Sequence, residues 1–200
     1  MIISDVNLDN GCPFGFKLFN MDSMQFNPTK IVRLVGNIDE EKSEAFLADL
    51  REMAASEAEG GITIVIHSDG GTPDDAMRIL DAIQMLKERG LAVHTIVTGK
   101  AYSMAAIIYC MGDYRTIYPN GLLMFHSSRY PELQDYDVTG AKLMDLYNEL
   151  KVFDDRFFAI MSATGVPKEL VEKSKTSDVY FSAEDAVKYG IAHSIEREIL

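Results

Sequence analysis

The sequence has few cysteines and few cations. Its two cysteines, Cys12 and Cys110, lie far apart and outside any CxxC pattern, so neither a disulfide framework nor a zinc knuckle is expected. This cysteine usage suits a reducing compartment, and we predict a cytoplasmic protein. With 19 basic and 31 acidic residues the formal net charge is -12, which argues against nucleic acid or an anionic membrane as the natural partner.

Signals for export and membrane insertion are also missing. No stretch approaches the ~20 apolar residues of a membrane span, and the first residues, MIISDVNLDNGCPFGF, lack the cationic and apolar regions of a signal peptide. We therefore expect an unexported protein without a membrane segment. No motif for a metal ion or a nucleotide is apparent, so we predict no cofactor for this chain.

Hydrophobic periodicity predicts an α/β fold. The 47% hydrophobic content suits one domain with a sizeable core. Residues 1–28 show no periodicity and are interpreted as an N-terminal arm, which leaves 29–200 as a single domain. From residue 30 on, short β-branched segments alternate with amphipathic helices. The predicted strands are 30–36, 62–67, 91–97, 114–118 and 122–126. The predicted helices include one around 46–54 and three others, at 73–88, 103–112 and 138–163.

The segment ITIVIHSDGGTPDDAM, residues 62–77, changes abruptly from strand to helix. Thr72 followed by Pro73 is a typical helix start. Gly70 and Gly71 give the backbone the freedom to bend just before it. The two glycines could serve only a tight turn, or they could let a ligand approach the backbone closely.

Ser103 and His126 are the candidates for chemistry. A serine at a helix start is most often an N-cap, but the backbone N–H groups and the helix dipole there also favour developing negative charge. His126 ends the strand GLLMFH, follows Ser103 in the chain, and has the near-neutral pKa that the base of a serine nucleophile needs. The spacing of His67, His94 and His193 is not that of metal ligands, and we interpret them as structural. Composition alone does not choose the carboxylate of a triad among 31 acidic residues.

Four segments together resemble the ClpP family of self-compartmentalising serine peptidases. They are the Gly-Gly turn that opens a helix, GKAYSMAA, LLMFHSS and SDVYFSAEDAVKYGI, which match in order and approximate spacing from Lys30 to Ile195. The resemblance implies the ClpP/crotonase-like α/β spiral of β-β-α units, with a handle over about 127–163. It also implies an endopeptidase that hydrolyses unfolded proteins and peptides.

Carried over residue by residue, the family pattern makes Ser103 the nucleophile, His126 the general base and Asp178 the orienting carboxylate. The N–H groups of Gly71 and Met104 become the oxyanion hole, and the implied chemistry is acyl transfer. The resemblance further implies a homo-oligomer of two stacked rings, usually heptameric, fed by a AAA+ unfoldase of the Clp type. That partner would use the ATP, and we expect the rings to stack through 127–150.

The chain departs from the family pattern beside the predicted site. Family members carry Asn-Ser-Pro-Gly-Gly where this sequence has HSDGG, so Asp69 places a carboxylate next to the predicted oxyanion hole. Ser127-Ser128 replaces the usual Gln-Pro after the histidine, and RYPELQDYD replaces the Gly- and Gln-rich handle segment. The N-terminal arm differs from the family's axial-loop segment, so the identity of the unfoldase stays open.

Four other interpretations stay open at this stage. A crotonase-type acyl-CoA enzyme shares the turn-built oxyanion hole but does not need a Ser/His/Asp set. A Ser-Lys peptidase would use Lys100, three residues before Ser103. Asp69 and the altered handle would suit a non-catalytic ring subunit that assembles with an active paralogue. A phage-type protease that cleaves virion proteins would have the same site residues.

Overall fold

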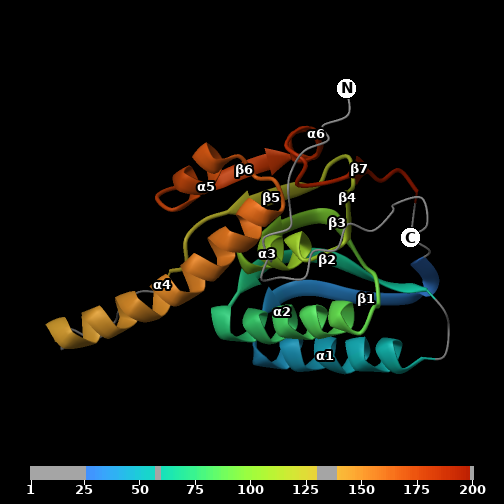
Figure 1. The fold of residues 1–200 in the computed structure, drawn as a ribbon, viewed down its shortest axis with the longest axis horizontal. Coiled ribbons are helices and arrows are strands. Elements are labelled where there is room, and N and C mark those ends of the chain that lie inside the picture. The colour runs from blue at the N-terminus through green and yellow to red at the C-terminus, as the bar shows by residue number, and fades with distance from the viewer. Residues whose placement is uncertain (1–25, 57–59, 130–138, 199–200) are drawn as a thin grey trace.

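The computed structural model describes residues 26–56, 60–129 and 139–198. Their centre is a mainly parallel sheet, which confirms the α/β class (Figure 1). Strand order is β1-β2-β3-β4-β7, with β5 paired to β3 and β6 paired to β5. The one antiparallel pair among these is β5–β6. The strands are β1 Phe26–Ile38, β2 Gly61–Gly71, β3 Val93–Tyr102, β4 Tyr114–Ile117, β5 Leu122–Phe125, β6 Val179–Ser182 and β7 Ser194–Ile195.

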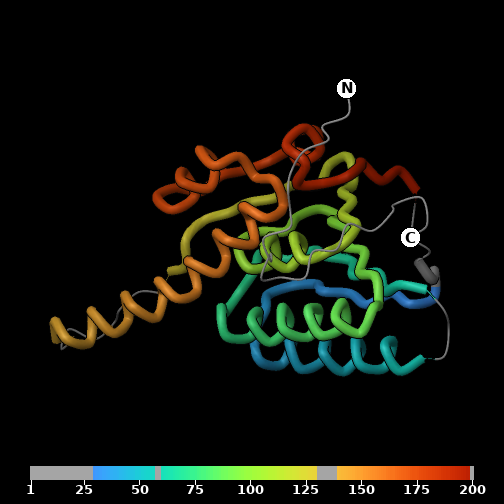
Figure 2. Tube along the Cα trace, in the orientation of Figure 1, coloured from blue at the N-terminus to red at the C-terminus, as the bar shows by residue number. Residues whose placement is uncertain are grey.

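Six helices complete the described part of the chain. They are α1 Glu40–Ala55, α2 Pro73–Glu88, α3 Met104–Cys110, α4 Gly140–Ala163, α5 Lys168–Ser174 and α6 Ala183–Lys188. Helices α1 and α2 lie side by side along the body, whereas α4 projects away from it (Figures 1 and 2). The predicted helix 73–88 is confirmed at both ends.

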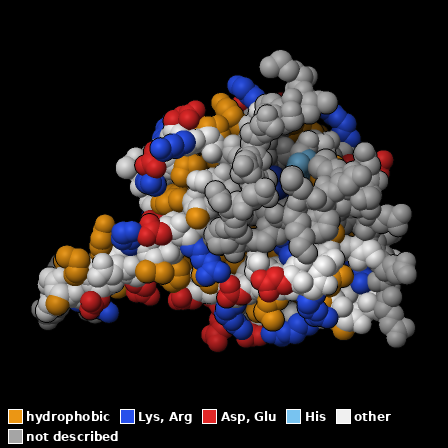
Figure 3. Space-filling model, in the orientation of Figure 1, with side chains coloured by type: hydrophobic (Ala, Val, Ile, Leu, Met, Phe, Trp, Pro, Cys, Tyr) orange, Lys and Arg blue, Asp and Glu red, His pale blue; other side chains and the backbone are white. Residues whose placement is uncertain are grey.

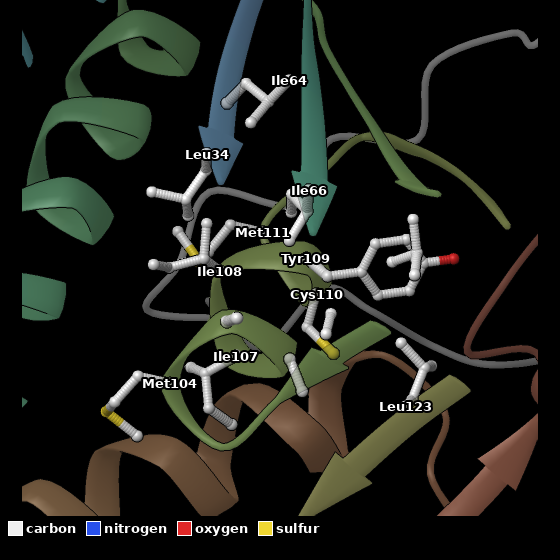
Figure 4. Packing of buried hydrophobic residues seen from close by; sticks show 14 of the residues in the cluster. Leu34, Ile64, Ile66, Met104, Ile107, Ile108, Tyr109, Cys110, Met111 and Leu123 are labelled. Atoms are coloured by element: carbon white, nitrogen blue, oxygen red, sulfur yellow. The ribbon is translucent and has the colours of Figure 1, made fainter. Parts of the chain in front are cut away.

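Helix α3 lies inside the core. Every one of its residues is buried, as expected for a helix that is apolar all round. Figure 4 shows Ile108 of α3 beside Leu34 of β1, whereas Ile107 lies on the opposite side of the helix, near Met104. Because packing on all sides holds α3, the position of its first residue relative to the sheet is also fixed.

Three strands are longer than the sequence predicts. Strand β1 starts at Phe26, inside the predicted arm; β2 continues through Gly71 instead of ending at 67; and β3 continues to Tyr102 instead of ending at 97. The extensions come from pairing between strands, with Ser68 opposite Ala101 and Gly71 opposite Ile38. Local hydrophobic patterning does not report such pairing. As a result, β3 leads directly into α3 through a single residue, Ser103.

Helix α4 begins two residues later than predicted, because Thr139 caps it by accepting a hydrogen bond from the N–H of Lys142. Its last turns are buried against the core, but its first half is exposed. The arm up to residue 25, with Cys12, and the segment 130–138 lie outside the described residues. Within the described part of the chain, no helix is both long enough and apolar enough to span a bilayer.

Candidate active site

Ser103 joins β3 to α3 in a conformation that L residues rarely adopt. Its φ is 54° and its ψ is -125°, and it is the only non-glycine residue with positive φ among the described residues. It occupies the N-cap position of α3, but its side chain makes no capping hydrogen bond. The hydroxyl therefore does not serve as a helix cap. A serine that holds a strained backbone conformation without capping its helix indicates that this side chain is placed for a function.

The backbone of Ser103 is tied to strand β5. Its N–H donates a hydrogen bond to the carbonyl of Met124 at 2.8 Å, and Tyr102 is paired in register with Met124. His126 directly follows β5, just as Ser103 follows β3. The carboxyl ends of neighbouring parallel strands meet at one edge of a sheet, where ligands of α/β folds usually bind. The structure thus brings Ser103 and His126 to the same edge.

His126 and Asp178 lie opposite each other at the end of the antiparallel pair β5–β6. Phe125 is paired with Val179, so His126, which follows β5, and Asp178, which precedes β6, lie at the same end of this strand pair. The Nδ1 atom of His126 is buried and has no hydrogen-bond partner. The carboxylate of Asp178 instead forms an ion pair with the guanidinium of Arg129. The structure therefore brings the three predicted triad residues into one neighbourhood without a hydrogen bond between Asp178 and His126.

The pKa of His126 lies below its ordinary value of 6.5, mainly because the imidazole is partly buried. The positive charge of Arg129 lowers this pKa further, and the carboxylates of Asp178 and Asp154 raise it. A histidine with a lowered pKa is neutral at pH 7. It is therefore in the form that accepts a proton.

Arg129 and Asp154 were not singled out in the sequence. The Oδ1 atom of Asp154, on α4, accepts a hydrogen bond from the N–H of Ser128 at 2.7 Å and so ties the segment after His126 to α4. These partners are 26 residues apart in the chain, and no spacing rule connects them. The one available signal was the position of Arg129, three residues after the candidate base.

The glycine turn packs tightly against Ser103 and β1. A Cβ at Gly70 would lie 2.7 Å from the carbonyl oxygen of Tyr102 and 2.8 Å from the Cβ of Ser103. A Cβ at Gly71 would lie 1.9 Å from the carbonyl oxygen of Ile38. Both positions therefore need glycine for packing within the fold itself. The sequence did not predict this close packing; it suggested only a tight turn or the approach of a ligand.

Asp69 and Lys100, two residues singled out separately in the sequence, form an ion pair. The Nζ of Lys100 lies 2.6 Å from Oδ1 of Asp69. The carboxylate beside the glycine turn is therefore compensated by a cation from β3. The base of a Ser-Lys peptidase would have to reach the serine, and here the Nζ of Lys100 contacts Asp69 instead, so this contact argues against that alternative.

Two of the other histidines are structural. Nε2 of His94 is hydrogen-bonded to Oγ1 of Thr116 at 2.9 Å, and Nδ1 of His193 accepts a hydrogen bond from the N–H of Arg115 at 2.9 Å. Burial lowers the pKa of each histidine from 6.5 to about 4. Within the described ranges, no group of three or more His, Cys, Asp or Glu side chains could hold a metal ion.

A strained serine, a partly buried neutral histidine and a carboxylate at one edge of an α/β sheet define a candidate site for acyl transfer. The family model described as Clp protease matches residues 19–198 of the chain. The chain therefore belongs to the Clp protease family, whose members are in general serine peptidases. Membership confirms the resemblance seen in the sequence and favours a peptidase over an acyl-CoA enzyme.

Proposed function

We propose that this chain is the serine endopeptidase subunit of a self-compartmentalising Clp-type protease, with Ser103 as nucleophile, His126 as general base and Asp178 as orienting carboxylate. One observation carries the proposal. Ser103 holds a strained backbone conformation at the edge of the sheet that it shares with His126, and its hydroxyl does not cap the helix it begins.

The proposed reaction is acyl transfer to water. The Oγ of Ser103 attacks the carbonyl carbon of the scissile peptide bond while His126 takes the hydroxyl proton. His126 then gives this proton to the leaving amine, and the C–N bond breaks. A water molecule, deprotonated by the same imidazole, hydrolyses the resulting ester and restores Ser103.

The N–H groups of Gly71 and Met104 are proposed to stabilise the oxyanion. The N–H of Gly70 is already bonded to Oγ of Ser68 at 3.0 Å, and that of Thr72 to the carbonyl of Ile38 at 2.9 Å. Because successive N–H groups of an extended chain point to opposite edges, the N–H of Gly71 is directed away from β1. The N–H of Met104 belongs to the first turn of α3, where it has no intrahelical partner.

The role of Asp178 requires a change of partner. Its carboxylate now binds Arg129, and the buried Nδ1 of His126 across the strand pair has no partner. We propose that Asp178 accepts a hydrogen bond from Nδ1–H of His126 in the working enzyme, which fixes the imidazole tautomer. This carboxylate is about one-third exposed, so movement between the two partners needs no change in the core.

The proposed substrates are unfolded polypeptides. A AAA+ unfoldase of the Clp type would deliver them and use ATP, so this chain itself needs no cofactor. The proposed assembly is a cytoplasmic homo-oligomer of two stacked rings, usually heptameric in this family, without nucleic acid or membrane partners. The exposed apolar side chains on the projecting part of α4 support stacking through this helix (Figure 3).

Peptide hydrolysis tests the proposal. Wild type should cleave a short fluorogenic peptide and unfolded casein, and Ser103→Ala should lower the rate at least ~10³-fold. Ser162→Ala is the matched control, since this hydroxyl bonds only within α4 to the carbonyl of Phe158. Full activity of Ser103→Ala would reject the proposed nucleophile.

The ion pair between Arg129 and Asp178 favours one second candidate, a non-catalytic ring subunit, because it occupies the carboxylate that a triad needs. Absence of hydrolysis by an assembled, folded wild-type protein would favour this candidate. Activity that appears only after an active paralogue is added would support it further.

A further inference from the structure

Two charged residues next to the candidate nucleophile compensate each other. Asp69 precedes the glycine that packs against Ser103, and Lys100 lies three residues before Ser103 on β3. Their side chains meet at 2.6 Å, although they are 31 positions apart in the sequence (100 minus 69). The pair joins the ends of two adjacent strands whose register here is fixed by Ser68 opposite Ala101.

The contact lies at the rim of the site. The side chain of Asp69 is 63% exposed and that of Lys100 is 33% exposed. An ion pair with this exposure adds little to the stability of the fold. Its two residues nevertheless belong to the segments that form the proposed site, Asp69 two residues before Gly71 and Lys100 three before Ser103. Charges beside a site of acyl transfer act on the rate even when they contribute little to folding.

The turn at Gly70 and Gly71 is also held by a hydrogen bond within the segment that carries Asp69. The N–H of Gly70 donates to the buried Oγ of Ser68, while a Cβ at Gly70 would be 3.1 Å from the backbone N of Met104. Asp69 lies between Ser68 and Gly70 in the chain, two residues before Gly71, whose N–H is proposed to hold the oxyanion. Without a cation nearby, the carboxylate of Asp69 would oppose the developing charge.

We propose that Lys100 is a positioning residue that compensates the charge of Asp69 at the oxyanion site. The inference rests on the proposed function, and it gives Lys100 no role in proton transfer. The departure from the family pattern at Asp69 is then acceptable because Lys100 is present.

A charge-balance experiment tests this inference. The second-order rate constant for modification of Ser103 by a fluorophosphonate is measured for wild type, Lys100→Met, Asp69→Asn and the double variant. In this reaction an O–P bond forms, the P–F bond breaks and fluoride leaves, and His126 takes the hydroxyl proton. Because negative charge develops on the phosphoryl oxygen, the rate reports on the oxyanion site.

The expected pattern is asymmetric. Lys100→Met should lower the rate about tenfold, and Asp69→Asn should raise it by up to about threefold. The double variant, which has neither charge, should return to within about threefold of wild type. The loss in Lys100→Met should shrink at high salt, since an exposed charge is screened. Lys42→Met, the same substitution on α1, should leave the rate unchanged.

Two results would overturn the inference while leaving the proposed function intact. One is a double variant as slow as Lys100→Met, as a lysine base or a purely structural tie would give. The other is a Lys100→Met variant that reacts like wild type. A folded wild type that is not modified at all would instead overturn the proposed function, and this inference with it.

Discussion

The backbone at Ser103 is the residue-scale feature on which the site depends. A serine with positive φ is costly, and such strain persists only where the surroundings determine it. Here the surroundings are the hydrogen bond to Met124, the buried helix α3, and Gly70 packed against the Cβ of Ser103. The absence of a side chain at position 70 is therefore part of how the candidate nucleophile is placed.

Substitution of Gly70 by alanine tests this placement. Gly70 and Gly36 have similar φ angles, +95° and +89°, but a Cβ at Gly36 would have no atom within 4 Å. Gly36→Ala should cost only the conformational strain, about 1 kcal/mol of unfolding free energy. Gly70→Ala should cost ~1–3 kcal/mol more and lower the reactivity of Ser103 at least tenfold.

Urea unfolding and the fluorophosphonate rate constant provide the two measurements. Equal losses of stability in Gly70→Ala and Gly36→Ala, with unchanged reactivity of Ser103, would show that the glycine turn does not position the serine.

Arg129 contributes to the pH dependence of the candidate base. Burial lowers the pKa of His126 most, and the charge of Arg129 lowers it further; Arg129 also pairs with the carboxylate of Asp178, which raises this pKa. Arg129→Ala should therefore raise the pKa of His126. Since the neutral imidazole is the reactive form, the acid limb of the pH–rate profile should move to higher pH.

The profile of fluorophosphonate modification between pH 5 and 8 measures this shift. Arg156→Ala, which removes a guanidinium that pairs with Asp81, is the matched control and should not move the limb. Movement of the Arg129→Ala limb to lower pH would contradict the account.

At the scale of elements, local signals predicted helices better than strand ends. Thr72 followed by Pro73 at the start of α2 is a signal that depends on residues within one turn. The ends of β2 and β3 depend instead on pairing with neighbouring strands. The sequence therefore predicted the order of elements and the start of α2, but not the continuous passage from β3 into Ser103.

The same distinction applies to the site. Ser103, His126 and Asp178 could be named because they lie in short segments that resemble a known family. The partners of those residues could not be named, since Arg129 meets Asp178 and Lys100 meets Asp69 only when distant strands come together. Contacts of this kind follow from strand register, which one sequence does not encode locally.

Helix α4 is the element that should mediate assembly. Its projecting half exposes Leu143, Met144 and Tyr147, with 48%, 59% and 61% of their surfaces accessible. Met144→Lys combined with Tyr147→Glu should prevent stacking of two rings, because burying charges without partners is costly. The unfolding midpoint of the chain should not fall, since these side chains lie outside the core.

Native mass spectrometry and light scattering give the measurement. Met85→Lys, which changes an equally exposed methionine on α2, should keep the wild-type assembly. A double variant of α4 that assembles like wild type would exclude this helix as the stacking element.

At the scale of the whole molecule, two histidines outside the candidate site, His94 and His193, should make the fold sensitive to acid. His94 and His193 have pKa values of about 4 in the folded chain, against 6.5 ordinarily. Between these values the unfolded chain binds more protons, so stability is full above pH 6.5 and is lost as pH falls towards 4. The loss should be at most about 1.4 kcal/mol per pH unit for each histidine.

Urea unfolding at several pH values from 4.5 to 7 measures this slope. His94→Gln combined with His193→Asn should flatten it, whereas a substitution of the exposed His67 should not. An unchanged slope in the double variant would assign the acid sensitivity to other groups.

The central claim, that Ser103 is an activated nucleophile with His126 as its base, is tested most directly by intact mass after treatment with a fluorophosphonate. Wild type should gain one adduct, which peptide mapping places on Ser103, and Ser103→Ala and His126→Ala should gain none. A folded, assembled wild type that gains no adduct, or gains it on another residue, would contradict the account.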